Sequence, residues 1–310
     1  MRYKPTNDLL FKKTFTSIGN EALLQALIQD LTGTSFEAVE VTTPYNFERF
    51  KQDAQEEAQA NTLIYTEVDL RARTSTGDLV TIEMQVRFPD YFIERTQYYA
   101  YSAYVAAYAD EVSMRQKRNK YSSIHSVYGI NISASNLYEP HHAALRVYEM
   151  QDTQIGEPLA QMNGRQIEDV KLIYLDLTNT NLPEDSAVYH WWRFFNGLDS
   201  LPQAPAYIDR AYDLIALDNM TKEEITMINQ LEYHKANSEA LLATAERVGR
   251  EAGIETGRKE GIEVGRESER KSTIQKMIAN GMTTGQIAVI LDLPIEEVEK
   301  FLENPEDSGR

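Results

Sequence analysis

The sequence contains no cysteine, no long apolar run and too few basic residues to balance its acids. Without cysteine the chain cannot form disulfides, zinc–thiolate sites or a cysteine nucleophile. No stretch of about 18 consecutive apolar residues occurs, so we expect no membrane-spanning helix. Charged residues scattered through the N-terminal stretch MRYKPTNDLLFKKTF also argue against a signal peptide. These absences favour a cytoplasmic protein with no membrane partner.

The charge balance is strongly acidic, with 31 Lys and Arg against 48 Asp and Glu and a formal net charge of −17. Such a chain is repelled by nucleic acid on average. A basic cluster, with Arg115 and Lys117 at its centre, is a candidate for substrate binding, although a solvated surface is the favoured explanation. Contact with nucleic acid would therefore have to be local and assisted by a cation.

What the sequence does contain is enough apolar and aromatic material for a sizeable core. The 310 residues are 42% hydrophobic and include 18 Tyr and 10 Phe. Helix-like and strand-like patterns mix over the first 200 residues, which predicts an α/β or α+β domain. We divide the chain into a globular domain (1–200), a helical segment (201–248), a glycine-rich helical stripe (249–270) and a helix-turn-helix-like tail (271–310).

Local signals fix several elements. Asn7 or Asp8 is placed to cap a first helix, and Gly33 to end a second. Two strand-like runs, Leu63 to Arg73 and Leu79 to Val86, predict a hairpin in which Gly77 supplies a positive φ. Further strands are expected in SIHSVYGINIS, AALRVYEM and VKLIYLDLT, and a tyrosine-rich helix in YFIERTQYYAYSAYVAAYA.

The predicted hairpin carries one acid on each arm, Asp69 and Glu83, among apolar residues. If the loop centres on Thr76, these acids lie opposite each other, with Cβ atoms about 5 Å apart. Two carboxylates at that separation repel each other unless a proton or a cation lies between them. An oxygen-lined pair suits Mg²⁺ or Mn²⁺. Two alternatives remain: a solvated sheet face, or pairing of Asp69 with an arginine.

The chain resembles a known nuclease family. Four segments carry the resemblance: NDLLFKKTF, EVDLRAR, TIEMQV and ERTQYYAYSAY. Their combination is similar to the PD-(D/E)XK nuclease superfamily and, more closely, to the Rpn family of recombination-promoting nucleases and related transposases. The resemblance implies a restriction-endonuclease-like mixed sheet flanked by helices, with a helical C-terminal extension.

The resemblance also implies roles for individual residues. Asp69 and Glu83 would be metal ligands, joined by the backbone carbonyl of Met84. Gln85 stands where most of the superfamily has lysine, and can orient water or donate a neutral hydrogen bond. Asp8 would present an acid to the metal from the N-terminal helix, although a capping role explains it as well.

Three further residues are weaker candidates for substrate binding. Arg71 shares the strand face of Asp69, so it could seat a phosphate, and surface solvation explains it equally well. Gln97 and Tyr101 form Q-x-x-x-Y, which resembles a motif of some nucleases of the superfamily. Packing on the sheet is the expected role of the other tyrosines of this helix, Tyr98, Tyr104 and Tyr108.

Glycine recurs at every fourth position from Gly249 to Gly265. Each glycine costs a helix up to ~1 kcal/mol relative to alanine, which favours close packing of a second backbone and hence a homo-oligomer. A tolerated linker helix is the alternative. Beyond it, the helix expected to begin at Pro294 is acidic, so we expect it not to bind DNA.

These observations predict a metal-dependent DNA endonuclease that promotes recombination or is linked to mobile elements. The alternative is a non-catalytic protein of the same fold that serves as an interaction module or transposase accessory factor. The acidic net charge and the absence of the motif lysine favour the alternative, whereas Asp69 and Glu83 favour the enzyme.

Overall fold

The structure is a computed structural model that describes residues 3–59, 69–85, 91–109, 125–137, 139, 141–159 and 169–303. The chain divides into two compact units, Met1–Tyr233 and His234–Arg310. Arg115 and Lys117 lie outside the described residues, as do residues 63–68 and 86 of the predicted hairpin strands. No described helix is both long and apolar enough to cross a membrane.

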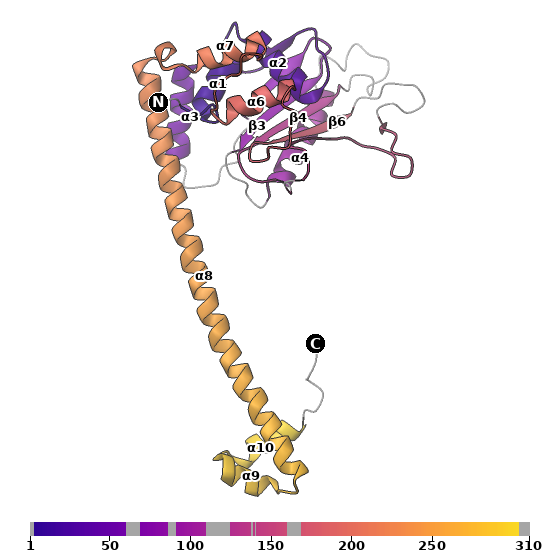
Figure 1. Ribbon diagram of the computed structural model, residues 1–310, viewed down its shortest axis with the longest axis vertical. Coiled ribbons are helices and arrows are strands. Elements are labelled where there is room, and N and C mark those ends of the chain that lie inside the picture. Colours follow the sequence, from indigo (N-terminus) through magenta and orange to yellow (C-terminus); the bar gives the residue numbers. More distant parts are fainter. Residues whose placement is uncertain are drawn as a thin grey trace. The chain divides into compact units, whose positions relative to one another are not determined.

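A mixed sheet forms the centre of the first unit (Figure 1). Its six described strands lie in the order β1-β2-β3-β4-β6-β5. The neighbours β3, β4 and β6 are parallel, whereas β1, β2 and β5 run antiparallel to their neighbours. The strands are β1 (Val39–Val41), β2 (Leu70–Thr74), β3 (Leu79–Gln85), β4 (Val127–Ser133), β5 (Leu145–Tyr148) and β6 (Val170–Asp176). The predicted mixed sheet flanked by helices is therefore confirmed.

Helices cover the two faces of the sheet unequally. Helix α2 contacts β1, β4 and β6 and is joined on that face by α1, α6 and α7. The opposite face is covered by α4, which contacts β3, β4 and β6 (Figure 1). The bounds are α1 (Asp8–Thr16), α2 (Glu21–Thr32), α3 (Phe47–Gln59), α4 (Phe92–Ala109), α6 (Ala187–Phe195) and α7 (Ala206–Leu214). Because both faces are covered, all seven residues of β4 are buried.

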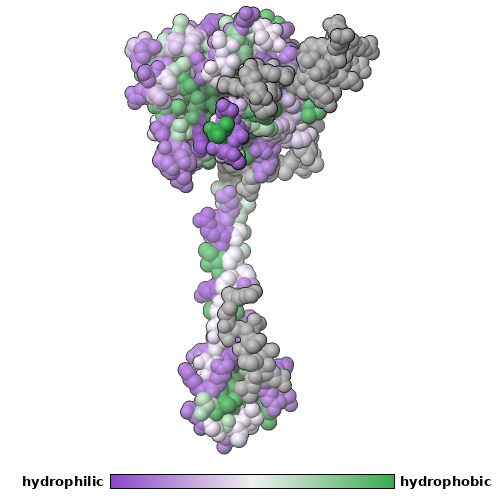
Figure 2. All heavy atoms as spheres, turned by 90° about the vertical axis from the view of Figure 1, so that its right-hand side faces the viewer, coloured by the Kyte–Doolittle hydropathy of each residue, from purple (hydrophilic) through white to green (hydrophobic). Residues whose placement is uncertain are grey.

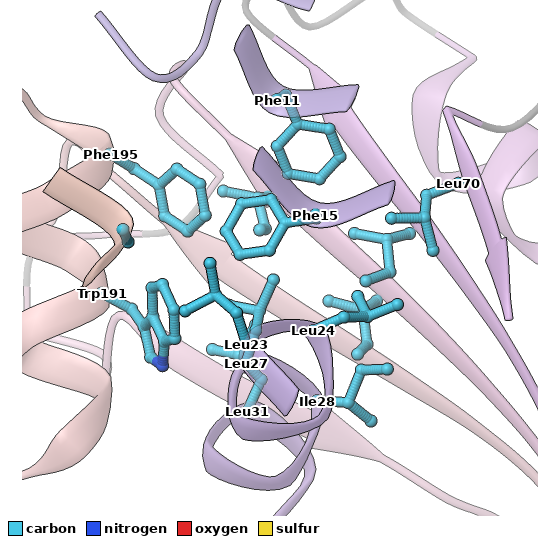
Figure 3. Close-up of a cluster of buried hydrophobic side chains, with 14 of the residues drawn as sticks. Phe11, Phe15, Leu23, Leu24, Leu27, Ile28, Leu31, Leu70, Trp191 and Phe195 are labelled. Carbon is cyan, nitrogen blue, oxygen red and sulfur yellow. The ribbon is translucent and has the colours of Figure 1, made fainter. Parts of the chain in front are cut away.

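The larger core lies between α1, α2, α6 and the sheet (Figure 3). Phe15 contributes an aromatic ring whose centroid lies 5.7 Å from that of Trp191 and 6.1 Å from that of Phe195. Apolar residues of α2 recur at helical spacing and are buried against this cluster. Burying one such side chain contributes about 1.5–3 kcal/mol, so this face supplies most of the stability of the first unit.

The predicted start of the first helix and the predicted end of the second helix are both confirmed. Asn7, and not Asp8, caps α1: its side chain accepts a hydrogen bond from the N–H of Leu10 at 3.5 Å. Asp8 is the first residue of the helix. Gly33 ends α2 with φ 67°, and its N–H donates to the carbonyl of Gln29.

The second unit contains the greater part of α8 (Lys222–Ala279), then α9 (Thr284–Leu291) and α10 (Ile295–Glu303). A small apolar core joins Ile274 of α8 to Ile287 and Val298. Thr283 and Gln286 form a capping box at the start of α9. The predicted tail helices are thus present, and the last begins directly after Pro294. Hydrophobic and hydrophilic residues alternate along the exposed length of α8 (Figure 2).

Candidate active site

The hairpin of β2 and β3 brings the two predicted acids together. Leu70 pairs with Ile82 and Arg71 with Thr81, so the same register places Asp69 opposite Glu83. The turn depends on Gly77, which has φ 96° and leaves no room for a side chain, since a Cβ would lie 2.6 Å from the His125 ring. The predicted hairpin and its register are therefore confirmed in the described residues.

The sheet face that carries the acids is buried at β3 and exposed at β2. Glu83 is only 5% exposed, whereas Arg71 and Arg73 on the same face are exposed. The difference arises because α4 covers β3 and leaves the edge next to β2 uncovered. The alternative of a solvated sheet face is therefore wrong for Glu83.

Glu83 is held by a side chain that the sequence did not single out. Arg95 of α4 places its Nη2 atom 2.5 Å from Oε1 of Glu83 and 2.5 Å from Oε1 of Gln85. The second carboxylate oxygen of Glu83, Oε2, is buried and has no hydrogen-bond partner. One oxygen of this carboxylate is thus satisfied by a cation, and the other is left for a further ligand.

Asp69 is held by the backbone of the opposite strand. Its Oδ2 atom accepts a hydrogen bond from the N–H of Met84 at 2.6 Å. The interaction ties the start of β2 to the end of β3 and fixes the carboxylate beside Glu83. The Met84 carbonyl as a metal ligand stays a prediction.

Both carboxyl groups are electrostatically unfavourable in their charged form. Burial, together with the nearby Asp8 and Glu83, raises the pKa of Asp69 well above its usual value, against the Met84 hydrogen bond and Lys12. Burial raises the pKa of Glu83 to about 7, although Arg95 opposes the shift. A proton or a cation between the two acids would reduce the repulsion between the two carboxylates and the cost of burying their charge.

Charged residues in the first turns of α1 also influence the pKa values of Asp69 and Glu83. Asp8 raises the pKa of both acids, and Lys12 lowers the pKa of both. Lys12 Nζ lies 3.2 Å from Oδ2 of Asp8, one turn away on the same helix. Asp8 therefore acts electrostatically on the hairpin acids, and Lys12 acts on them in the opposite sense. The role of Asp8 as a metal ligand stays a prediction.

The donor set fits a hard divalent cation in part. Within the described residues, no three Asp, Glu or His side chains are grouped closely enough to hold a metal ion by themselves. Asp69 and Glu83 nevertheless offer carboxylate oxygens side by side, and the Glu83 Oε2 atom is buried without a partner. A buried carboxylate oxygen without a hydrogen-bond partner is suited to act as a cation ligand. The chemistry of these two residues therefore fits Mg²⁺ or Mn²⁺.

Gln97 and Tyr101 lie on the exposed side of α4, and Tyr101 is 44% exposed. At about 100° per residue, Gln97 is turned about 200° from Arg95, so the motif does not lie on the flank that reaches Glu83. The prediction that Tyr98 packs on the sheet is wrong, since this side chain is 64% exposed. Phe92 and Ala100 fill that position instead.

Sequence reasoning singled out neither Arg95 nor Lys12. A usable signal for Arg95 was present: it is the one basic residue between Phe92 and Ala109. A lone basic residue on a helix rich in apolar and aromatic residues, next to strands that carry acids, indicates an ion pair. No comparable signal marks Lys12, because its neighbours Asp8 and Lys13 suit an exposed helix equally well.

Comparison with known proteins identifies one match. The family model described as PD-(D/E)XK nuclease family transposase matches residues 5–245. Neither the curated proteins nor the solved structures give a significant match. The matched segment includes the hairpin acids, α4 and the first turns of α8.

Proposed function

The chain belongs to the PD-(D/E)XK nuclease family transposases, and from this premise we propose that it is a metal-dependent endonuclease that hydrolyses phosphodiester bonds of DNA. The observation that carries the proposal is the pair Asp69 and Glu83, set opposite each other with one buried, unpartnered oxygen on Glu83. The family supports a nuclease-like function. The choice of DNA and of Mg²⁺ or Mn²⁺ belongs to the proposal.

In this proposal Asp69 and Glu83 hold the divalent ion. When bound, such an ion polarises the phosphodiester and lowers the pKa of water. Met84 keeps Asp69 in place through its N–H. Gln85 extends from the end of β3 beside Glu83 and is available to orient water or a phosphate oxygen.

The distribution of charge supports an anionic substrate at this edge of the sheet. Arg71 and Arg73 are exposed on the face that carries the acids. They offer phosphate contacts beside the hairpin, although the chain as a whole carries a formal charge of −17. Binding is therefore expected to weaken steeply as salt rises, because a few local cations carry it. The proposed link to mobile elements is supported by the family description, which names a transposase, and the proposed role in recombination rests only on the resemblance to the Rpn family.

A second candidate function is a non-catalytic interaction protein on the same fold. Arg95 already neutralises one oxygen of Glu83, and glutamine stands in place of the motif lysine. Both features suit a site that has lost the need for a metal. The two candidates differ in their response to divalent ions.

The test measures melting temperature and plasmid cleavage with and without millimolar Mg²⁺ or Mn²⁺. The endonuclease proposal expects both ions to raise the melting temperature, because they bind only the native site, and to switch on cleavage. Asp69→Asn should abolish both responses while preserving shape. Glu94→Gln, an exposed acid of α4, is the matched control and should retain both. Cleavage by Asp69→Asn at the native rate would refute the endonuclease assignment.

We also propose that α8 assembles with a second copy of the chain. A Cβ added at any glycine from Gly249 to Gly265 would meet no atom within 4 Å, so the stripe has no neighbour within the described chain. Exposed Leu241, Ile254 and Ile262 lie along the same helix. A helix of this composition gains most from a partner backbone at close range.

Light scattering tests the assembly. Ending the chain after Glu246 removes the stripe and should lower the measured mass to that of one chain. Ending it after Ala279 removes α9 and α10 and should leave the number of chains per particle unchanged. A single-chain mass for the full protein would contradict the proposal.

A further inference from the structure

The guanidinium of Arg95 is fixed at the end of β3 by three neighbours. Its Nη2 atom lies 2.5 Å from Oε1 of Glu83 and 2.5 Å from Oε1 of Gln85. The Cζ atom lies 5.8 Å from the centre of the Phe92 ring, and the side chain is 18% exposed. These contacts hold the guanidinium in place, so it in turn determines the orientation of the side chains that it contacts.

The contact with Arg95 decides the orientation of the Gln85 amide. Arginine carries donors only, so Gln85 can meet it only through its carbonyl oxygen. The NH₂ group of Gln85 is therefore turned away from Arg95 and left as a donor. A carbonyl that accepts a hydrogen bond from a cation is polarised, which strengthens the N–H groups of the same amide as donors.

We propose that Arg95 is a positioning residue that, through Gln85, gives a phosphate oxygen of the substrate the donor and the positive charge that a lysine at position 85 would give it. The proposal rests on the proposed nuclease function. It adds, beside the two acids that would hold the metal, a source of positive charge for the substrate phosphate in the same site. A lysine would combine donor and charge in one group. Here Gln85 is the donor, and the charge stays one hydrogen bond behind it, on Arg95.

A simpler role for Arg95 is to neutralise the buried carboxylate of Glu83, and the two roles predict different behaviour. As a counter-ion alone, Arg95 is equally necessary whatever uncharged residue stands at position 85. As the positioning residue of Gln85, it loses most of its effect once position 85 has no amide to orient. A double-mutant cycle between the two positions separates these cases.

The cycle compares the native chain, Arg95→Gln, Gln85→Leu and the double variant in plasmid cleavage with Mn²⁺. Arg95→Gln should slow cleavage at least tenfold in the native background and less than threefold in the Gln85→Leu background. Arg95→Lys keeps the charge and should retain part of the rate. Arg210→Gln removes an equal charge from an exposed site on α7 and should change nothing. Equal losses in both backgrounds would overturn the inference.

A second measurement does not depend on cleavage. Binding of a short fluorescent DNA duplex is measured in EDTA at low salt, with melting curves confirming that each variant is folded. Arg95→Gln should weaken binding at least threefold, and Arg210→Gln should not. No binding by the native chain, or equal binding by the two variants, would overturn the role of Arg95. Binding that depends on Arg95 without any cleavage would count against the nuclease proposal alone.

Discussion

The two faces of the sheet differ in role: one carries the larger hydrophobic core, and the other carries the residues of the candidate active site. The face under α1, α2 and α6 is filled by aromatic and aliphatic side chains such as Phe15, Leu24 and Trp191 (Figure 3). The face under α4 has a small apolar cluster around Phe92 and ends in the polar group of Glu83, Gln85 and Arg95. A mutually repelling pair of acids, of which Glu83 is buried and Asp69 half-buried, is costly, and the opposite core offsets that cost. A site of this kind is therefore possible because its own face need not hold the fold together.

The largest effect is expected on the face under α1, α2 and α6, where most of the stability should be concentrated. Trp191→Ala removes a fully buried indole that stacks on Phe195 and Tyr207. It should lower the free energy of unfolding by about 3–5 kcal/mol in urea titrations. Tyr98→Ala, at an exposed position of α4, should change it by less than about 0.5 kcal/mol. A loss below about 1 kcal/mol for Trp191→Ala would show that stability is not concentrated on this face.

The second prediction concerns how the acid pair changes the free energy of unfolding as pH changes. Burial raises the pKa of Glu83 in the folded chain from 4.5 to about 7, so the folded state holds a proton that the unfolded state has released. The contribution of Glu83 to the stability of the metal-free protein should therefore fall by at most about 3 kcal/mol as pH rises from about 4.5 to about 7, and should level off above that. The raised pKa of Asp69 acts in the same direction.

Urea titrations in EDTA across this range measure the dependence. Glu83→Gln should flatten the curve, whereas Glu94→Gln, which changes the net charge equally, should leave its shape intact. Stability that rises with pH in the native chain would mean that the folded state does not hold the extra proton.

The smallest expected effect lies in the apolar part of the α4 face. Thr96 Oγ1 lies 2.6 Å from the hydroxyl of Tyr174, and both residues are buried. Thr96→Val leaves that hydroxyl without its partner and should cost about 1–2 kcal/mol. The double variant Thr96→Val with Tyr174→Phe should cost less than the sum of the two single changes. Additive losses would mean that the pair does not anchor α4 to β6.

The sequence predicted the features that local rules control. Alternation along a strand and one glycine with positive φ were enough to place Asp69 opposite Glu83. The end of α2 at Gly33 and the start of α10 after Pro294 follow from equally local preferences.

The rest depends on how distant segments pack. The contact of Arg95 with β3 is set by where α4 crosses the sheet, and that crossing is decided by burial of Phe92 and Ala100. The position of β6 between β4 and β5 is likewise a matter of the whole sheet. The approach of Asp8 to the hairpin was suggested by resemblance, and its nearby Lys12 was not recognised.

The first helix is completed by residues that are synthesised long after it. Asn7, which caps α1, donates to Glu232 at 2.9 Å, and Lys13 Nζ lies 2.7 Å from Glu224. The first pair is separated by 225 positions in the chain. At 5–20 residues per second, a ribosome needs roughly 10–45 s to cover that distance. These two contacts of α1 can therefore form only after about three quarters of the chain has been synthesised.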